Sequence, residues 1–137
     1  MRRIDYIVVH TTATPQTATV ESITRYWREV KGWRTVGYHK VVPPNGATVR
    51  LAPDSAVTNG VAGHNSNSLH VSYIGGVDAK GRALDNRTPQ QKAELERIIT
   101  AWLALYPNAK VVGHRDFPGV KKACPSFDVA AWWASVK

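Results

Sequence analysis

The stretch KVVGHRDFPGVKKACPSFD, at residues 110–128, is where the sequence predicts a strand end and a reactive site together. Its short apolar run ends at His114, and the only cysteine of the chain, Cys124, follows ten residues later. A loop that carries Pro118 and Gly119 separates the two and could fold one back over the other. Imidazole nitrogen and thiolate sulfur are ligand types that zinc takes. This stretch therefore predicts part of a metal site, and a further ligand must come from elsewhere.

The composition is that of one globular domain, which we expect to span residues 1–137. Of the 137 residues, 43% are hydrophobic and 20% are charged, both ordinary values for such a domain. A single cysteine cannot form a disulfide within the chain. The apolar run after Arg2 and Arg3 is interrupted by Asp5 and ends without a small-residue cleavage site, so we do not expect a signal peptide. No run approaches the roughly 18 apolar residues of a membrane span.

The chain is strongly basic. Its formal net charge is +8, from 18 basic and 10 acidic residues. Such an imbalance favours a polyanionic partner, which could be nucleic acid, an acidic membrane or a phosphate-rich cell envelope. A single-stranded nucleic-acid surface would interleave aromatic and basic residues on strands, whereas Trp27 belongs to the apolar stripe of a predicted helix. We therefore do not expect nucleic acid as the partner.

Periodicity and turn signals predict an α/β fold. Thr19 and Thr88 cap two amphipathic helices, the second within the capping box Thr88-Pro89-Gln90-Gln91, and Ser126 is predicted to cap a terminal helix. Runs rich in apolar and β-branched residues predict strands at 4–9, 37–42, 47–51, 69–74 and 109–112. The order β-α-β-β-β-α-β-α indicates a single mixed central β-sheet of about five strands flanked by about three helices.

Five histidines are candidates for the missing ligand: His10, His39, His64, His70 and His114. His39 and His70 lie within predicted strands, and we interpret each as a packed or hydrogen-bonded histidine. His64 lies in the polar segment 53–68, which we interpret as a lid or a binding rim, so its imidazole could touch a substrate. A loop also holds a metal less precisely than a strand end does. Position therefore favours the two histidines that end strands.

His10 ends the first predicted strand, as His114 ends the last. Two neighbouring strands that end at one edge of a sheet would bring both imidazoles within reach of Cys124, and ligands usually bind at that edge. Three protein ligands would leave a fourth position open, which is the pattern of catalytic zinc. From spacing alone, the alternative of a free buried thiol beside two unrelated histidines stays open.

Lys122 stands two residues before the cysteine and would lie close to such a metal. A cation there can stabilise the negative charge that develops on a carbonyl oxygen under attack. Alternatively, Lys122 is one more surface lysine of a basic protein. Two other kinds of zinc enzyme are excluded, since the chain has no His-Glu-x-x-His motif and its single cysteine cannot supply the Cys-x-x-Cys of a deaminase.

Several motifs, in order along nearly the whole chain, match one known family. They are VVHTTAT at 8–14, GW at 32–33, VGYH at 36–39, NS at 67–68, GG at 75–76, TPQ at 88–90, GHRD at 113–116 and KACPSFD at 122–128. The chain thereby resembles the type 2 N-acetylmuramoyl-L-alanine amidases, especially the small phage lysozymes of the T-odd coliphage kind. These are related to peptidoglycan recognition proteins, and the resemblance implies their fold.

The resemblance also implies a reaction and the residues that perform it. His10, His114 and Cys124 match the zinc ligands of the family, Lys122 its catalytic lysine, and Tyr38 a tyrosine needed for activity that does not bind zinc. The implied reaction is hydrolysis of the amide between N-acetylmuramic acid and L-alanine in peptidoglycan, with one zinc ion per chain to activate water. Tyr38 would orient that water or assist proton transfer, although a phenol with a pKa near 10 is a poor base at neutral pH.

We expect a phage or prophage endolysin, made in the host cytoplasm without a signal peptide and acting on the cell wall after release. It would be a monomer with electrostatic contact to the anionic envelope. RNA polymerase binding, a second activity of the coliphage kind that has a longer N-terminal segment, is not expected because this chain starts almost directly at its first strand. The alternative is a binding module of the same fold that recognises peptidoglycan without cutting it, although such relatives typically lose the cysteine. A substrate rim is predicted at His64, Asn65, Asn67 and Arg115.

Overall fold

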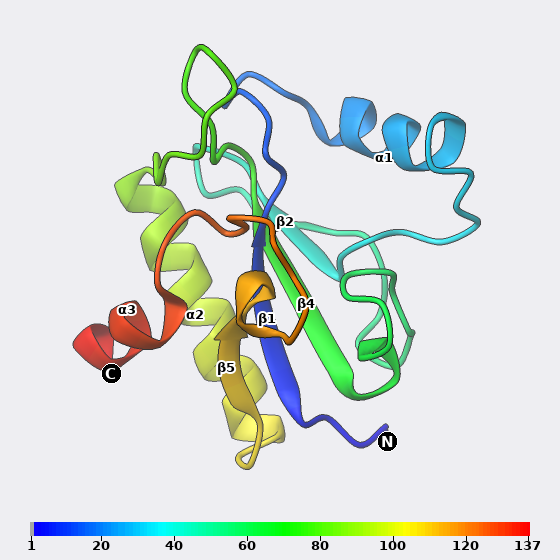
Figure 1. Ribbon diagram of the computed structural model, residues 1–137. Coiled ribbons are helices and arrows are strands. Elements are labelled where there is room, and N and C mark those ends of the chain that lie inside the picture. Colours follow the sequence, from blue (N-terminus) through cyan, green and yellow to red (C-terminus); the bar gives the residue numbers. More distant parts are fainter. Residues whose placement is uncertain (1) are drawn as a thin grey trace.

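The computed structural model describes residues 2–137 as a mixed five-stranded sheet with three α-helices, which confirms the predicted fold class (Figure 1). The sheet has the order β3-β2-β4-β1-β5, in which only β3 runs antiparallel to its neighbour. The strands are β1 (Tyr6–Thr11), β2 (Lys40–Val42), β3 (Val49–Arg50), β4 (Ser68–Tyr73) and β5 (Lys110–Gly113). The helices are α1 (Val20–Glu29), α2 (Pro89–Leu105) and α3 (Val129–Val136), with short 3-10 turns at Asn65–Asn67 and His114–Asp116.

Two of the three predicted helix caps are confirmed, and one is wrong. Thr19 and Thr88 begin α1 and α2, and each accepts a hydrogen bond from the backbone three residues on, within a capping box. Helix α3 is capped by Asp128, whose carboxylate accepts from the backbone N–H of Ala131 at 3.1 Å. Ser126 cannot take that role, because it has a left-handed φ of 73° and its hydroxyl donates to the carbonyl of Gly76.

The two faces of β1 have different partners. Ile7 and Val9 belong to the main core, where α2 and α3 cover one face of the sheet with residues such as Leu95 and Trp102 (Figure 1). Because side chains alternate along a strand, Val8 and His10 point to the opposite face. Val8 is fully buried there, in a cluster with Phe117 from the loop after β5. This second face is covered mainly by loops, which is where binding residues are usually carried.

The central strand β4 is buried along its whole length. Its apolar residues, which include Leu69 and Val71, belong to the α2-facing core. The alternating residues Ser68, His70 and Ser72 must therefore point to the loop-covered face. The parallel register pairs Val8 with His70 and His10 with Ser72. The polar side chains of β4 consequently lie on the same face of the sheet as His10, and they are buried there.

The hairpin predicted at 37–42 and 47–51 exists, but its strands are shorter than expected. Gly37 and Tyr38 pack beneath α1, whereas the backbone N–H of His39 still donates to the carbonyl of His70 at 2.9 Å. A Cβ atom on Gly37 would lie 3.0 Å from the ring of Trp27, so the backbone approaches that ring closely. Tyr38 follows at once and packs against the cluster of Ile23 and Trp27. This irregular segment carries Tyr38 to the edge where the parallel strands end.

No helix within residues 2–137 has both the length and the apolar character needed to cross a lipid bilayer.

Candidate metal centre

Three side chains with metal-binding atoms converge at the carboxyl ends of the parallel strands. One ligand atom from each of His10, His114 and Cys124 can be chosen so that all lie within 4.8 Å of one another. His10 is buried, while the other two side chains are partly exposed. The predicted juxtaposition of two strand-end histidines and the cysteine is confirmed.

The sheet register brings the two histidines together. β1 and β5 are parallel neighbours in which Val9 pairs with Gly113, so the residues that follow them, His10 and His114, emerge side by side. Their ring centroids are 4.9 Å apart. The backbone at Gly113 is tightly packed, because a Cβ atom there would lie 2.9 Å from the ring of Pro125. This close approach holds the end of β5 against the segment that carries the cysteine.

The loop between His114 and Cys124 closes on itself. The backbone N–H of Arg115 donates to the carbonyl of Cys124 at 2.9 Å, which fixes the cysteine next to the start of the loop. The backbone N–H of Thr11 donates to the sulfur of Cys124 at 3.2 Å. That sulfur lies 3.9 Å from Nδ1 of His10. Nδ1 is therefore the nitrogen that His10 turns toward the other two ligands.

A cavity of about 760 Å³ opens beside this cluster. Tyr38 and Lys122 line it together with the three candidate ligands. The ring of Tyr38 lies 4.8 Å from that of His10, and its hydroxyl donates to the carbonyl of Thr11 across 3.5 Å. The five side chains that the family resemblance selected therefore line one cavity.

Burial keeps the titratable groups of the cluster uncharged when no cation is present. It raises the pKa of the Cys124 thiol to about 11, although the Thr11 amide and the Lys122 ammonium oppose the shift. Burial also lowers the pKa of His10, and the neighbouring His70 and His114 add to that effect. A cation bound between these groups would supply the positive charge that a thiolate needs.

The donor set fits zinc. Two imidazole nitrogens and one thiolate sulfur are ligands that this ion prefers, and three such ligands leave one position for water or substrate. Among residues 2–137 no other cluster of three histidine, cysteine, aspartate or glutamate side chains meets the same distance criterion. His10, His114 and Cys124 are therefore the residues that could hold a metal.

The four residues predicted to form a substrate rim lie outside the lining of this cavity. His64 packs against Phe117, with ring centroids 4.6 Å apart. Asn67 donates to the carboxylate of Asp5, and Asn65 accepts from the backbone N–H of Val61. Arg115 is exposed on the short turn after β5. Their role toward a substrate stays a prediction.

Other residues line the cavity that sequence reasoning did not select. One wall comes from α1 and the segment after it, including Tyr26, Lys31 and Trp33. The polar segment 53–68 contributes Asn59 and Ala62, as a binding rim would. The glycine-tryptophan pair before Tyr38 is the signal in the sequence that could have indicated this wall. Lys31, which follows α1, adds a cation to the lining.

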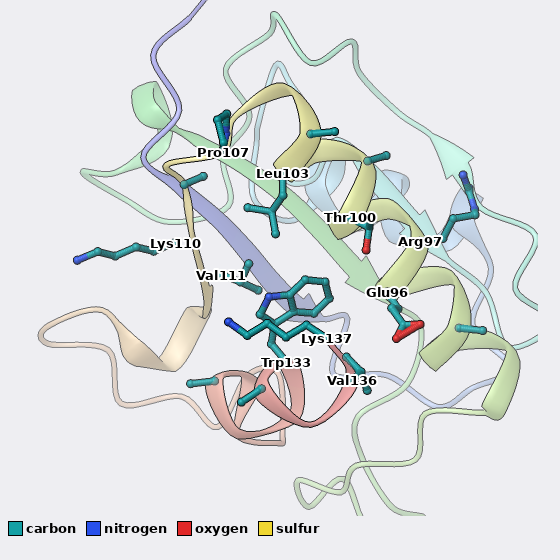
Figure 2. Close-up of a pocket in the computed structure, with 16 residues that line it drawn as sticks. Glu96, Arg97, Thr100, Leu103, Pro107, Lys110, Val111, Trp133, Val136 and Lys137 are labelled. Carbon is teal, nitrogen blue, oxygen red and sulfur yellow. The ribbon is translucent and has the colours of Figure 1, made fainter.

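A second, larger hollow of about 1160 Å³ lies on the other side of the molecule, between α2, β5 and α3. Leu103 and Trp133 point into the space between the two helices (Figure 2). Lys110 and Lys137 are among its charged lining residues. No histidine or cysteine lines it, so it lacks the metal-binding chemistry of the first cavity.

Fold and site together define a mixed α/β protein with three side chains that could hold a metal at the carboxyl edge of its parallel strands. Residues 1–127 match the sequence model of the N-acetylmuramoyl-L-alanine amidase family. The endolysin of Escherichia phage T7 is 37% identical over 131 residues, which are 94% of this chain and 85% of that protein. The endolysin of Klebsiella phage KP32 is 38% identical over 93% of this chain and 83% of its own length. The chain therefore belongs to the N-acetylmuramoyl-L-alanine amidase family.

Solved structures show the same fold. The Ph2119 endolysin from the Thermus scotoductus bacteriophage Ph2119 superposes with a TM-score of 0.83 at 27% identity, over 98% of this chain and 85% of that one. Drosophila PGRP-LB superposes with a TM-score of 0.77 over 99% of this chain and 82% of that one. Its identity of 16% means that this second likeness concerns the fold alone.

Proposed function

We propose that the protein is a zinc-dependent N-acetylmuramoyl-L-alanine amidase that cuts the bond between N-acetylmuramic acid and L-alanine in peptidoglycan. The observation that carries the proposal is the convergence of His10, His114 and Cys124 beside a cavity, in a chain of this family. These three residues would hold the metal. When bound, zinc supplies Lewis-acid chemistry, since it polarises a carbonyl and acidifies water.

Lys122 is the proposed stabiliser of the oxyanion. Its ammonium lies near enough to His114 and Cys124 to lower the pKa of each, and it lines the same cavity. A positive charge in that place opposes the negative charge that develops on the carbonyl oxygen during attack. Lys122 would thus act on the substrate without being a ligand.

Tyr38 is proposed to act as a hydrogen-bond donor. Burial raises the pKa of its phenol well above the ordinary value of 10, and the nearby Cys124 adds to the shift. Without a metal, the hydroxyl therefore keeps its proton at neutral pH, which favours a donor over a base. From its position beside His10, it can orient the attacking water or the carbonyl of the substrate.

The proposed setting is host lysis by a phage or prophage endolysin, after release of the protein to the cell wall. The endolysin names of the phage relatives support this setting. The net charge of +8 suits a wall and envelope rich in phosphate and carboxylate groups. A module that binds peptidoglycan without cutting it is the competing function, and it would not require the lysine beside the cysteine.

Metal analysis combined with product identification tests the proposal. Purified protein should carry about one zinc ion per chain. Digestion of purified sacculi should release peptides with L-alanine at the amino terminus and create no new reducing sugar ends. New reducing ends would identify a glycosidase, and binding without any released product would identify the binding module. Either result would overturn the amidase assignment.

The lysine pair Lys121 and Lys122 offers a matched control. Both side chains are exposed, but only Lys122 lines the cavity. Lys122→Ala should keep zinc and lose hydrolysis, by about 100-fold or more if its charge stabilises the oxyanion. Lys121→Ala should keep both zinc and hydrolysis. Normal hydrolysis by Lys122→Ala would contradict the role assigned to this lysine.

A further inference from the structure

The two nitrogens of His10 face different partners. Nδ1 points toward the sulfur of Cys124, whereas Nε2 lies 2.9 Å from Nδ1 of His70. A neutral imidazole carries one N–H, so one nitrogen donates and the other has the lone pair. His10 can offer Nδ1 to a metal only while the proton is on Nε2. Nδ1 of His70 must then accept a hydrogen bond from this Nε2–H group.

His70 continues this chain of hydrogen bonds away from the cavity. If its Nδ1 accepts from His10, its own proton is on Nε2. That nitrogen lies 3.0 Å from Oδ1 of Asn65, a distance at which the oxygen accepts the bond. The imidazole of His70 is fully buried, so water does not compete for either nitrogen.

The backbone N–H of Val61 fixes the direction of this chain of hydrogen bonds. Oδ1 of Asn65 also accepts from the backbone N–H of Val61 at 2.7 Å. A backbone N–H can only donate. The oxygen of the Asn65 side-chain amide, and not its NH2 group, must therefore face the N–H of Val61. Oδ1 has two lone pairs, one for Val61 and one for His70. In the reverse arrangement, His70 would donate to His10 from Nδ1, and its Nε2 would carry a lone pair. Two acceptors, Nε2 of His70 and Oδ1 of Asn65, would then face each other without a hydrogen bond.

Packing holds the ring of His70 in this place. A Cβ atom on Gly60 would lie only 2.3 Å from Nδ1 of His70, so the Gly60 backbone covers the ring directly. The ring also stacks on that of His39, with centroids 5.9 Å apart and planes at 14°. The backbone N–H of His70 also donates to Nδ1 of His39 at 3.0 Å. His70 is therefore confined to one orientation.

We propose that His70 and Asn65 are positioning residues for the metal centre, which hold His10 as the Nε2–H tautomer with Nδ1 free and aimed at His114 and Cys124. The inference rests on the proposed zinc site and assigns a role to two residues that do not touch the metal. Hydrogen-bond partners of ligating histidines fix the tautomer and ring orientation, and their loss typically costs 10–100-fold in metal affinity.

Zinc affinity, measured by competition with a chromophoric chelator, tests the proposal without using activity. His70→Phe keeps a ring but removes the acceptor, so zinc affinity should fall by about 10–100-fold. His70→Asn places an amide oxygen where Nδ1 of His70 lies, within reach of Nε2 of His10, and should recover most of that loss. The Asn65→Asp variant keeps an acceptor and should bind zinc more tightly than the Asn65→Leu variant. Equal affinities of His70→Phe and wild type would overturn the proposal.

Gln91→Met provides a control for a merely structural effect. Gln91 is buried, and its amide donates to the carbonyls of Val42 and Ile74 at 3.0 Å each, away from the metal cluster. The variant should be less stable in urea yet keep wild-type zinc affinity. If Gln91→Met lost as much affinity as His70→Phe, the effect would reflect general destabilisation, and the positioning role would be refuted.

Nitrogen-15 NMR of the imidazoles reads the tautomers directly in metal-free protein at neutral pH. His10 and His70 should both carry the proton on Nε2, and His10 should lose this preference in His70→Phe. Finding His10 protonated on Nδ1 in the wild type would overturn the inference. A wild type that shows the expected tautomers but binds no zinc would instead refute the proposed function, so the two failures are distinguishable.

Discussion

The backbone N–H of Thr11 donates to the sulfur of Cys124 across 3.2 Å, and so joins the end of the first strand to the loop after the last. The bond has two consequences for the cluster. It holds the sulfur on the side of His10, and it favours the thiolate that a metal requires. The sulfur is therefore positioned by secondary structure before any ion arrives.

Cys124→Ser should abolish zinc binding, because a serine hydroxyl does not replace thiolate as a zinc ligand. We expect the zinc content to fall from about one ion per chain to near zero, as measured by atomic absorption. Chelation should lower the melting temperature of the wild type, since an ion that binds only the folded state stabilises it. The melting temperature of Cys124→Ser should not respond to chelator. Retention of one zinc by this variant would contradict the assignment.

Tyr38→Phe should keep zinc and lose turnover, since it removes a hydroxyl but keeps the ring beside His10. A positioned donor of this kind contributes about 100-fold or more to rate. The loss should appear in kcat for release of L-alanine-terminated peptide from sacculi. Tyr106→Phe is the control, because Tyr106 lies at the carboxyl end of α2 and does not line the cavity. Unchanged turnover in Tyr38→Phe would remove this tyrosine from the mechanism.

Gly76→Ala should be far more destabilising than Gly81→Ala. Both glycines have left-handed φ angles, 94° and 79°, so each substitution introduces backbone strain. At Gly76 the new Cβ would also lie 2.0 Å from Oγ1 of Thr11, whereas at Gly81 it would meet open space. We expect losses of about 3 and about 1 kcal/mol in the free energy of unfolding, measured in urea. Equal losses would show that the contact with Thr11 can relax.

His39 should make the metal-free protein sensitive to acid. Burial lowers its pKa below the ordinary 6.5, against the effect of its hydrogen bond to the carbonyl of Ala56. Below about pH 6.5 the unfolded chain therefore binds a proton that the folded chain excludes, so stability is complete above that pH and falls as pH decreases. His39→Gln removes this contribution. Its free energy of unfolding should depend less steeply on pH between about 7.5 and 5. Identical slopes would contradict the prediction.

Much of the fold could be predicted because local signals agreed with tertiary structure. The capping boxes at Thr19 and Thr88 mark the starts of α1 and α2, and the apolar runs mark all five strands. The cap of α3 was misassigned to Ser126 because serine and Asp128 are both good caps. Only the contact of Ser126 with Gly76, which is distant in sequence, decides between them.

The candidate ligands could be selected because strand ends are visible in the sequence, but their supporting residues could not. His70 was correctly expected to be packed, yet its contact with His10 depends on the register of β1 against β4. Nothing in the sequence specifies that register. The wall that α1 contributes to the cavity was missed for a similar reason, since periodicity identifies its apolar face and does not show where its polar side chains lie.

The separation of 114 residues between His10 and Cys124 also constrains the order of events during synthesis. His10 leaves the ribosome 114 residues before Cys124 does. A nascent chain that ends before the final loop has β1 and its histidine but lacks the sulfur, so it cannot form the three-ligand site. The site thus becomes complete only after Cys124 has been translated, and products truncated before that residue cannot form it.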